Sequence, residues 1–346
     1  MEEFCSEFKS TLLEEEIILL NQFNDEFSMF PEQCYHWVNI SSTKNNCYYF
    51  GRYKNKLVTT CIINESNNIA RILFGPVFSD KKFIIDSIIA IKNHYNKNFG
   101  LLTIQLPIQS SQESTFIEYG LYNKIRFSQE YDTENWSSIK IDLSLDEEDI
   151  WKSIKPNHKG SIKKAKKMGA YTKAITTKNE IHKLSILYDQ MYINRGLVNT
   201  FSDTSKVFQQ ILEDKNINSI ILGVYSPDNI LIGGVICPII NNTIHYKIGV
   251  TDFNYRKYAA LHLALYSIIL QAKILSLNWF DLGGYNHFVK ESDQISKINL
   301  FKRSFGGEHI FFPNKIYIKL NPLTYFYTSI LRKTYFIYLS LKNKWR

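Results

Sequence analysis

The order of the predicted elements repeats along the chain, and this repeat restricts the fold more than any other feature. In the first half, a strand over 69–74 is followed by a helix with apolar residues at helical spacing and by a strand over 101–106. In the second half, a strand over 244–250, a helix over 259–275 and a strand over 279–282 follow in the same order. The repeated layout predicts two copies of one α/β fold, each with a mixed central sheet flanked by helices.

The boundary between the two copies is expected near residue 145. A chain of 346 residues is long enough for two domains of ordinary size. Apolar and polar residues alternate over 138–145, which predicts a strand with one buried face, and Ser144 with Glu147 forms a capping-box pattern for a following helix. We therefore expect an N-terminal domain at 1–145, a C-terminal domain at 146–320 and a basic, aromatic C-terminal helix at 321–346.

The C-terminal segment 323–346 is rich in Tyr, Phe, Leu, Lys and Arg, and two interpretations are open. An amphipathic helix of this composition can lie on a membrane surface. A helix with an apolar stripe can also pack on its own protein, which is the more common arrangement and the one that we favour.

Composition excludes several classes of function and leaves others open. The net charge is +8, which favours anionic partners such as phosphates, tRNA or an acidic membrane surface, although a generally Lys-rich protein gives the same balance. The five cysteines are scattered without a CxxC pair, and no HxxxH or HExxH motif occurs, so we expect neither a disulfide framework nor a metal site. The acidic N-terminus and the lack of a membrane-length apolar stretch predict a cytoplasmic protein, with peripheral contact at the inner face of the membrane left open.

The segment 279–307 carries the strongest candidate for chemistry. A short apolar run ends at Asp281 and the pair Gly283-Gly284, and Phe301-Lys302 precedes a second glycine pair. Glycines at a strand end let a ligand or another backbone come close, and a nearby lysine can stabilise negative charge that forms during a reaction. Lys302 also has an ordinary interpretation as a surface lysine. For Asp281, orienting Lys302 or the nucleophile and capping the following loop are both open.

Two further groups of cations are candidates for anion binding. Eight lysines occur between 152 and 173 without any carboxylate, and Lys163 and Lys164 lie in the middle of this run. An anionic ligand would relieve their mutual repulsion, but a solvated helix face is an equally good interpretation. Arg256 precedes the long helix at 259–275, where the unpaired N–H groups of a helix start favour phosphate. An ordinary surface cation is an equally good interpretation of this lone arginine near a helix start.

Taken together, these motifs resemble the FemABX family of aminoacyl- and acyltransferases, a branch of the GNAT superfamily. The resemblance covers nearly the whole chain and includes the Trp37 region, the run 72–77, the lysine helix with Ala165-Lys166-Lys167-Met168-Gly169 at its end, and the block 244–307. It implies two GNAT-like domains with a substrate cleft between them and a C-terminal helix packed on the first. The residues that it implicates are Lys302 and Asp281 in catalysis, with Arg256, Phe301, Gly283, Gly284, Lys163, Lys164 and Trp37 in substrate binding.

The resemblance also implies a reaction. Lys302 would stabilise the oxyanion formed when an amine attacks an ester or thioester carbonyl. The donor would be aminoacyl-tRNA or acyl-CoA, with no tightly bound cofactor, and the acceptor a cell-envelope precursor. Ser41 stands where peptidoglycan-directed members have a lysine, and the coiled-coil arm of some members is missing, so a peptidoglycan peptide and a surface-polysaccharide amino sugar are both open as acceptors.

Two other functions remain as alternatives. The first is an acyl-CoA-dependent N-acetyltransferase that acts on a nucleotide sugar. The second belongs to a different class, a non-catalytic module that binds tRNA or anionic lipid through its lysine helix.

Overall fold

The computed structural model describes residues 4–28, 30–41, 45–108, 128–129, 136–197, 199, 201–286, 289 and 294–330. The chain divides by its internal contacts into two compact units. The first unit comprises Met1–Tyr35, Lys44–Asn135 and Phe312–Arg346, and the second comprises His36–Thr43 and Trp136–Phe311.

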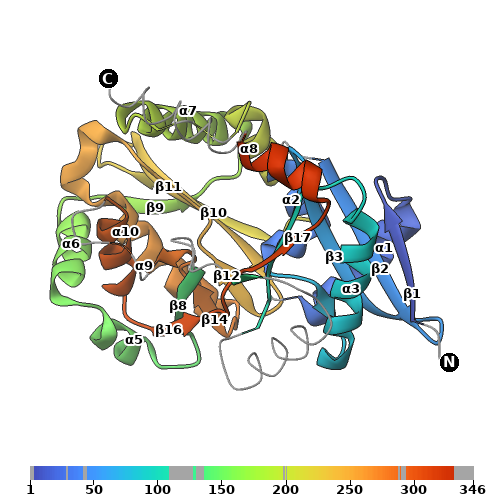
Figure 1. The fold of residues 1–346 in the computed structure, drawn as a ribbon. Helices are drawn as coiled ribbons and strands as arrows, with labels where there is room; N and C mark the ends of the chain where they lie inside the picture. Colours follow the sequence, from blue (N-terminus) through green and yellow to red (C-terminus); the bar gives the residue numbers. More distant parts are fainter. Residues whose placement is uncertain are drawn as a thin grey trace. The chain divides into compact units, whose positions relative to one another are not determined.

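The first unit contains a mixed sheet with the strand order β1-β2-β3-β4-β6-β17-β7, and β5 pairs with β3 beside this path (Figure 1). Strands β4 and β6 are parallel, and α3 connects them. Helix α3 places Ile84, Ile88, Ile91 and Tyr95 on one buried face, which gives the unit its core. The strands are β1 (Phe4–Lys9), β2 (Asn45–Tyr53), β3 (Lys56–Ser66), β4 (Ile69–Leu73), β5 (Val77–Phe78), β6 (Leu101–Gln105), β7 (Ser128–Gln129) and β17 (Ile316–Lys319); the helices are α1 (Glu14–Phe27), η1 (Pro31–Gln33), η2 (Lys81–Phe83) and α3 (Ile84–Tyr95).

The second unit contains a mixed sheet with the order β15-β8-β14-β12-β11-β10-β9, in which β13 also pairs with β11 and β16 with β8. The strands are β8 (Trp136–Asp142), β9 (Tyr171–Ala174), β10 (Ser219–Tyr225), β11 (Leu231–Ile240), β12 (Thr243–His245), β13 (Ile248–Thr251), β14 (Trp279–Asp281), β15 (Tyr285–Asn286) and β16 (Glu308–Phe311). The helices are α2 (Tyr35–Ser41), α5 (Glu147–Ser153), α6 (Pro156–Lys167), α7 (Lys178–Asn194), α8 (Thr204–Glu213), η3 (Phe253–Tyr258), α9 (Ala260–Ile274) and α10 (Gln294–Arg303). The first residue of α2, Tyr35, belongs to the first unit.

Helices α7 and α9 cover opposite faces of this second sheet (Figure 1). A Cβ added to Gly233 would lie 3.0 Å from the Cβ of Ala260 at the start of α9, whereas one added to Gly234 would lie 2.9 Å from Leu184 Cδ1 in α7. Successive residues of a strand point to opposite faces, so the two helices lie on the two sides of β11. The adjacent glycines let both helices approach the strand closely.

The repeat predicted from the sequence is present in the structure. In each unit two parallel strands are connected by a long helix, β4-α3-β6 in the first and β12-α9-β14 in the second. The predicted α/β class, with two mixed sheets flanked by helices, is confirmed.

The units differ from the expected domain limits at three places. The first is His36–Thr43, which was expected within 1–145 and belongs to the second unit. Strand β8, expected within 1–145, pairs with β14, β15 and β16, and its residues Ile139 and Ile141 belong to the core of the second unit. Strand β17, expected within 146–320, pairs with β6 and β7, and its residues Ile316 and Ile318 belong to the first core. Alternation shows that a strand has one buried face, but it does not show which sheet the strand joins.

Within the described residues, no helix has both the length and the apolar composition that crossing a membrane needs. Residues 322–330 are helical, as expected for the beginning of the C-terminal segment, and the rest of that segment lies outside the described residues.

Candidate functional site

Two neighbouring parallel strands of the second unit diverge at Asp281. Strands β12 and β14 are paired from Thr243 with Trp279 to His245 with Asp281. Beyond this point, the chain after β12 forms β13, which pairs with β11. The chain after Asp281 instead turns through 282–284 and pairs with β8 as β15. The divergence leaves backbone groups at the ends of both strands available for side chains or a ligand.

Lys302 lies at this divergence. It belongs to the last turn of α10 and is 9% exposed, and its Nζ donates hydrogen bonds to the carbonyl oxygens of Gly283 at 2.9 Å and Gly284 at 2.8 Å. A lysine ammonium has three N–H donors, and within the described part of the chain no group accepts the third. The two glycine carbonyls therefore fix the ammonium and leave one donor for a ligand.

The surroundings of Lys302 tune its proton affinity. Burial lowers the pKa of Lys302 to about 8, the nearby Asp281 carboxylate opposes this change, and the Lys247 charge adds to it. The side chain is consequently a cation at neutral pH but loses its proton more easily than an ordinary lysine.

Asp281 is buried, and both of its carboxylate oxygens face protein groups. Oδ1 accepts hydrogen bonds from Ser138 Oγ and from Gly283 N, the latter at 2.8 Å. Oδ2 lies 3.8 Å from His245 Nδ1 and 4.0 Å from Lys140 Nζ. Burial favours a higher pKa for Asp281, but the charges of His245 and Lys140 and the two hydrogen bonds outweigh it and lower the pKa. These contacts favour a positioning role, in which Asp281 holds the turn whose carbonyls bind Lys302.

The glycines on either side of Lys302 have backbone conformations that other residues avoid. Gly283 has a φ of +65°, and Gly306 and Gly307 have φ values of +83° and +90°. A Cβ on Gly306 would collide with Ser153, and one on Gly307 with the Lys140 carbonyl oxygen. The second glycine pair follows the end of α10 at Arg303 and turns the chain into β16.

Phe301 faces away from the ammonium and into a cluster of rings. Its ring centroid lies 5.2 Å from that of His158, 5.0 Å from that of His262 and 5.3 Å from that of Phe305. His158 Nε2 donates to the Phe301 carbonyl oxygen at 3.0 Å, which satisfies a group in the last turn of α10. Burial lowers the pKa of both histidines, to about 4 for His262. Phe301 therefore anchors α10, and its role in substrate binding stays a prediction.

Arg256 lines a small cavity together with a second arginine. Its guanidinium lies 3.5 Å from the Phe253 ring centroid, and the cavity, of about 150 Å³, is also lined by Arg195, Asn194, Thr251 and Met191. None of these lining residues carries a carboxylate. Sequence reasoning missed Arg195, which ends α7 some 60 positions before Arg256, so that only the fold brings the two together.

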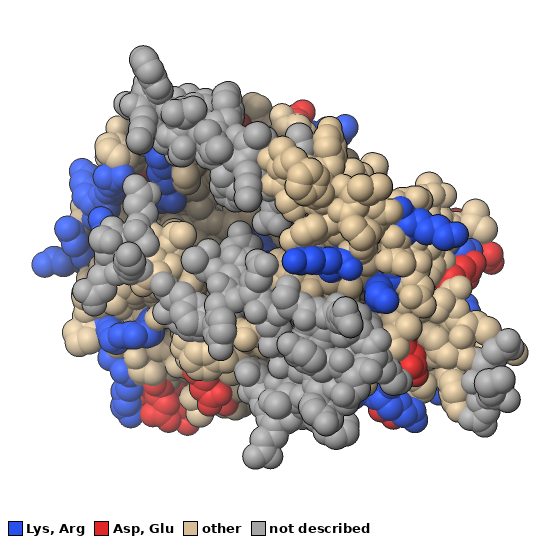
Figure 2. Space-filling model, viewed as in Figure 1, with Lys and Arg blue, Asp and Glu red and all other residues tan. Residues whose placement is uncertain are grey.

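The lysine helix presents a cationic outer face. His158, Ile162 and Ala165 face the core, whereas Lys163 and Lys164 are exposed. Figure 2 shows basic side chains gathered at the left of the view, over α6. Lys163 Nζ lies 5.9 Å from the Trp151 ring centroid, and no described carboxylate forms an ion pair with Lys163 or Lys164.

Trp37 lies in α2, and its side chain is buried. The preceding His36 bonds through Nδ1 to Asp214 Oδ2 at 3.0 Å, which attaches this helix to the second unit. Because the indole is buried, it offers little surface, and its predicted role in substrate binding stays a prediction.

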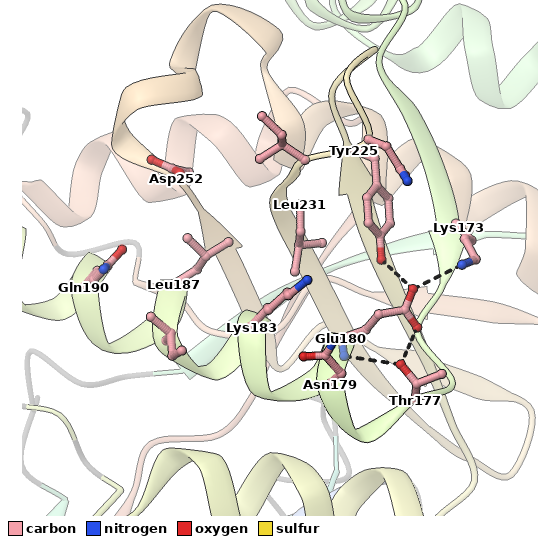
Figure 3. Close-up of a pocket in the computed structure, with 13 residues that line it drawn as sticks. Lys173, Thr177, Asn179, Glu180, Lys183, Leu187, Gln190, Tyr225, Leu231 and Asp252 are labelled. Carbon is pink, nitrogen blue, oxygen red and sulfur yellow. Dashed lines mark hydrogen bonds and ion pairs between the residues drawn. The ribbon is translucent and has the colours of Figure 1, made fainter.

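A cavity of about 740 Å³, which no motif in the sequence indicated, lies beside α7 (Figure 3). Glu180 accepts hydrogen bonds there from Lys173 Nζ at 3.1 Å, Thr177 Oγ1 at 2.9 Å and Tyr225 Oη at 3.1 Å. Burial opposes ionisation, but these donors prevail and bring the pKa of Glu180 down to about 2. Lys183 extends across the cavity toward Leu231, so a cationic group lies against an apolar wall.

No family model matches the sequence, and no curated protein matches it. Solved structures do match. A crystal structure of FemX has a TM-score of 0.73 at 9% identity, covering 92% of this chain and 98% of that chain. The C-terminal domain of a putative lysylphosphatidylglycerol synthetase from Agrobacterium fabrum has a TM-score of 0.62 at 9% identity, covering 92% and 95%. A tandem GNAT protein from the clavulanic acid biosynthesis pathway has a TM-score of 0.54 at 9% identity, covering 91% and 98%.

These similarities extend over both units, and they show a FemABX/GNAT-like fold. The fold that the resemblance predicted is confirmed. In the described residues the longest helix is α7, with 17 residues, and no coiled-coil arm is present.

Proposed function

We propose that this chain transfers an activated acyl or aminoacyl group to an amine of a cell-envelope precursor and forms an amide. The observation that carries the proposal is the Lys302 ammonium, fixed by two glycine carbonyls where β12 and β14 diverge, with one N–H donor left over. The fold supports the class of reaction, because FemX and tandem GNAT proteins share it. The acceptor is a peptidoglycan peptide or a surface-polysaccharide amino sugar.

The proposed chemistry needs one cation and good positioning. The acceptor amine attacks the carbonyl carbon, a C–N bond forms, and the carbonyl oxygen becomes an oxyanion to which Lys302 donates its third N–H. The C–O or C–S bond to the donor then breaks, and the leaving group takes up a proton. One such donor contributes about 3 kcal/mol to the transition state. The amine loses its proton to solvent or to the substrate.

Aminoacyl-tRNA is the donor that we favour. The exposed lysines of α6 suit an extended polyanion, and the cavity of Arg195 and Arg256 suits a single phosphate or carboxylate group. Acyl-CoA also carries phosphates, which the cavity of Arg195 and Arg256 could bind. This cavity therefore favours a second candidate function, an acyl-CoA-dependent N-acetyltransferase that acts on a nucleotide sugar.

We expect the double substitution Lys163→Gln and Lys164→Gln to weaken tRNA binding and to reduce the slope of log Kd against log salt by about 2, since each lysine that contacts a phosphate contributes about 1. The measurement is a filter-binding or fluorescence titration at several salt concentrations. The matched control, Lys206→Gln with Lys215→Gln, removes the same charge from exposed positions elsewhere in the second unit and should leave the slope unchanged.

The same titrations separate the donors. Tight CoA binding that is lost in Arg256→Gln, together with no tRNA binding, would favour the CoA alternative. Strongly salt-dependent tRNA binding without product from any donor would favour the non-catalytic module.

The rate of acyl transfer is expected to fall as the pH rises past about 8. The pKa of Lys302 is lowered to about 8, so the side chain is cationic below this pH and neutral above it, and a neutral amine stabilises an oxyanion poorly. The measurement is kcat/KM against pH for the wild type and for Lys302→Arg, whose guanidinium stays protonated. A wild-type profile without this alkaline fall, or the same fall in the arginine variant, would contradict the role of the ammonium.

A further inference from the structure

The cavity of about 740 Å³ beside α7 has no part in the proposed chemistry, and we call it the α7 cavity. One of its walls is a set of α7 residues spaced by three and four positions, which places their side chains on one face of the helix. The opposite wall comes from the end of β10, the start of β11 and the residue after β13 (Figure 3). The α7 wall consists of Asn179, Lys183, Ile186, Leu187 and Gln190.

The walls of the α7 cavity are held in place by the protein's own hydrogen bonds. At one end, the three hydrogen bonds to Glu180 described above attach the first turn of α7 to β9 and β10. At the other end, Asp252 N donates to the Ile232 carbonyl oxygen at 2.9 Å, and Asp252 Oδ1 accepts from Asn254 N at 2.8 Å. A site whose walls are already fixed loses less entropy when a ligand binds.

Two opposite charges line the α7 cavity without a charged partner. Lys183 and Asp252 form no ion pair with any residue in the described part of the chain, and Figure 3 shows them on opposite walls. The other two charges of the cavity, Lys173 and Glu180, pair with each other at 3.1 Å. A ligand that satisfies the unpaired groups therefore carries an anionic group for Lys183 and a cationic group for Asp252.

The helix sets the distance between these two charges. Gln190 follows Lys183 by seven residues, which is two turns of helix and a rise of roughly 10 Å along one face. Gln190 belongs to the Asp252 end, because the next residue, Met191, lines the small arginine cavity together with Thr251. An extended peptide spans about 3.3–3.6 Å per residue, so about three residues cover this distance.

The space between the two charges has an apolar floor and free amide groups. Leu187 from α7 and Leu231 from β11 form the floor. The side-chain amides of Asn179 and Gln190 have no hydrogen-bond partner among the residues that the structure describes. An amide group both donates and accepts hydrogen bonds, and the peptide group has the same two functions. A plain alkyl chain would satisfy the floor but would leave these amides unused.

We propose that the α7 cavity binds an elongated zwitterion with an apolar middle, its carboxylate on Lys183 and its ammonium on Asp252. The free amides favour a short peptide with unblocked ends over an alkyl amino acid of the same length. The inference does not depend on the proposed acyl transfer, because that reaction uses none of the residues that line the α7 cavity.

The test is isothermal titration calorimetry of the full chain with the tripeptide Ala-Leu-Ala. We expect binding, and we expect it to be about tenfold weaker when the peptide carboxylate is amidated or its amine is acetylated, since each change removes one charge-assisted hydrogen bond. The second probe is 8-aminooctanoate, which has a similar distance between its charges but no peptide groups. It should bind more weakly than the tripeptide.

Two substitutions assign the ends of the ligand. Lys183→Gln should weaken binding of Ala-Leu-Ala by about tenfold and have no effect on the amidated peptide. Asp252→Asn should do the same for the free and the acetylated peptide, and asparagine can still accept from Asn254 N. The matched controls are Lys206→Gln, at an exposed position, and Asp203→Asn, at the cap of α8, and both should bind like the wild type.

Three results would overturn the inference. They are the absence of binding for both probes, equal binding of the free and the blocked peptides, and losses from Lys183→Gln and from amidation that add instead of overlapping. An 8-aminooctanoate that binds as tightly as the tripeptide would overturn the preference for a peptide. None of these results bears on Lys302, so the proposed acyl transfer is tested separately.

Discussion

Replacing Lys302 with methionine is expected to lower the rate of acyl transfer by about 100- to 1,000-fold. Methionine keeps the unbranched shape of the side chain but loses the charge and all three N–H donors. The expected loss lies in kcat rather than in KM, because an oxyanion exists only in the transition state. The measurement is the single-turnover rate of acyl transfer from an aminoacyl-tRNA donor.

The fold should tolerate this change well enough for the comparison. The carbonyl oxygens of Gly283 and Gly284 lose their common donor, which costs about 1–3 kcal/mol of unfolding free energy. Lys297→Met is the matched control, since it removes an exposed lysine from the same helix and should leave the rate unchanged. If Lys302→Met turned over at the wild-type rate, Lys302 would have no role in the mechanism, and the description of the fold would be unaffected.

Replacing Asp281 with asparagine is expected to lower the free energy of unfolding by about 3–5 kcal/mol at neutral pH. Asparagine has nearly the same size and can still accept from Ser138 and Gly283, but it removes the negative charge that faces His245 and Lys140. Urea denaturation of the two proteins measures the difference. Asp146→Asn, an exposed position at the start of α5, is the control and should change the stability by far less.

The loss of stability caused by Asp281→Asn should become smaller as the pH falls. The pKa of Asp281 is lower in the folded chain than the value of about 3.9 expected for an unfolded one. Its charge therefore stabilises the fold fully above about pH 4, and this contribution disappears as the pH falls through the folded-state pKa. The difference in free energy of unfolding between wild type and variant should therefore decrease below about pH 4. A gap that is small at neutral pH would show that the carboxylate contributes little to holding the turn.

Local patterns in the sequence predicted the elements well but not their partners. The repeat of strand, helix and strand and the glycine pairs follow from spacing and residue type, whereas the family resemblance is what singled out Lys302. The structure places Lys302 on the turn after Asp281. The membership of β8 and β17 in their sheets depends on pairing between residues more than a hundred positions apart, which no local pattern encodes.

The same limit applies to the candidate site. His158 supports the Phe301 carbonyl across 143 positions, and Arg195 joins Arg256 only because α7 ends beside η3. The cavity around Glu180 and Lys183 draws on several elements, each of which has an ordinary surface composition. The burial of Trp37 also depends on the fold, and its role in substrate binding stays a prediction.

The return of β17 to the first sheet affects how the chain folds during synthesis. Ile316 and Ile318 belong to the first core, yet the ribosome makes them after every strand of the second unit. Until then β6 lacks its neighbour and is an unprotected sheet edge, where nascent chains are prone to associate. The second unit can complete its own sheet earlier, so we expect the later half of the protein to become protease-resistant first, and a stop before residue 316 to leave the earlier half aggregation-prone.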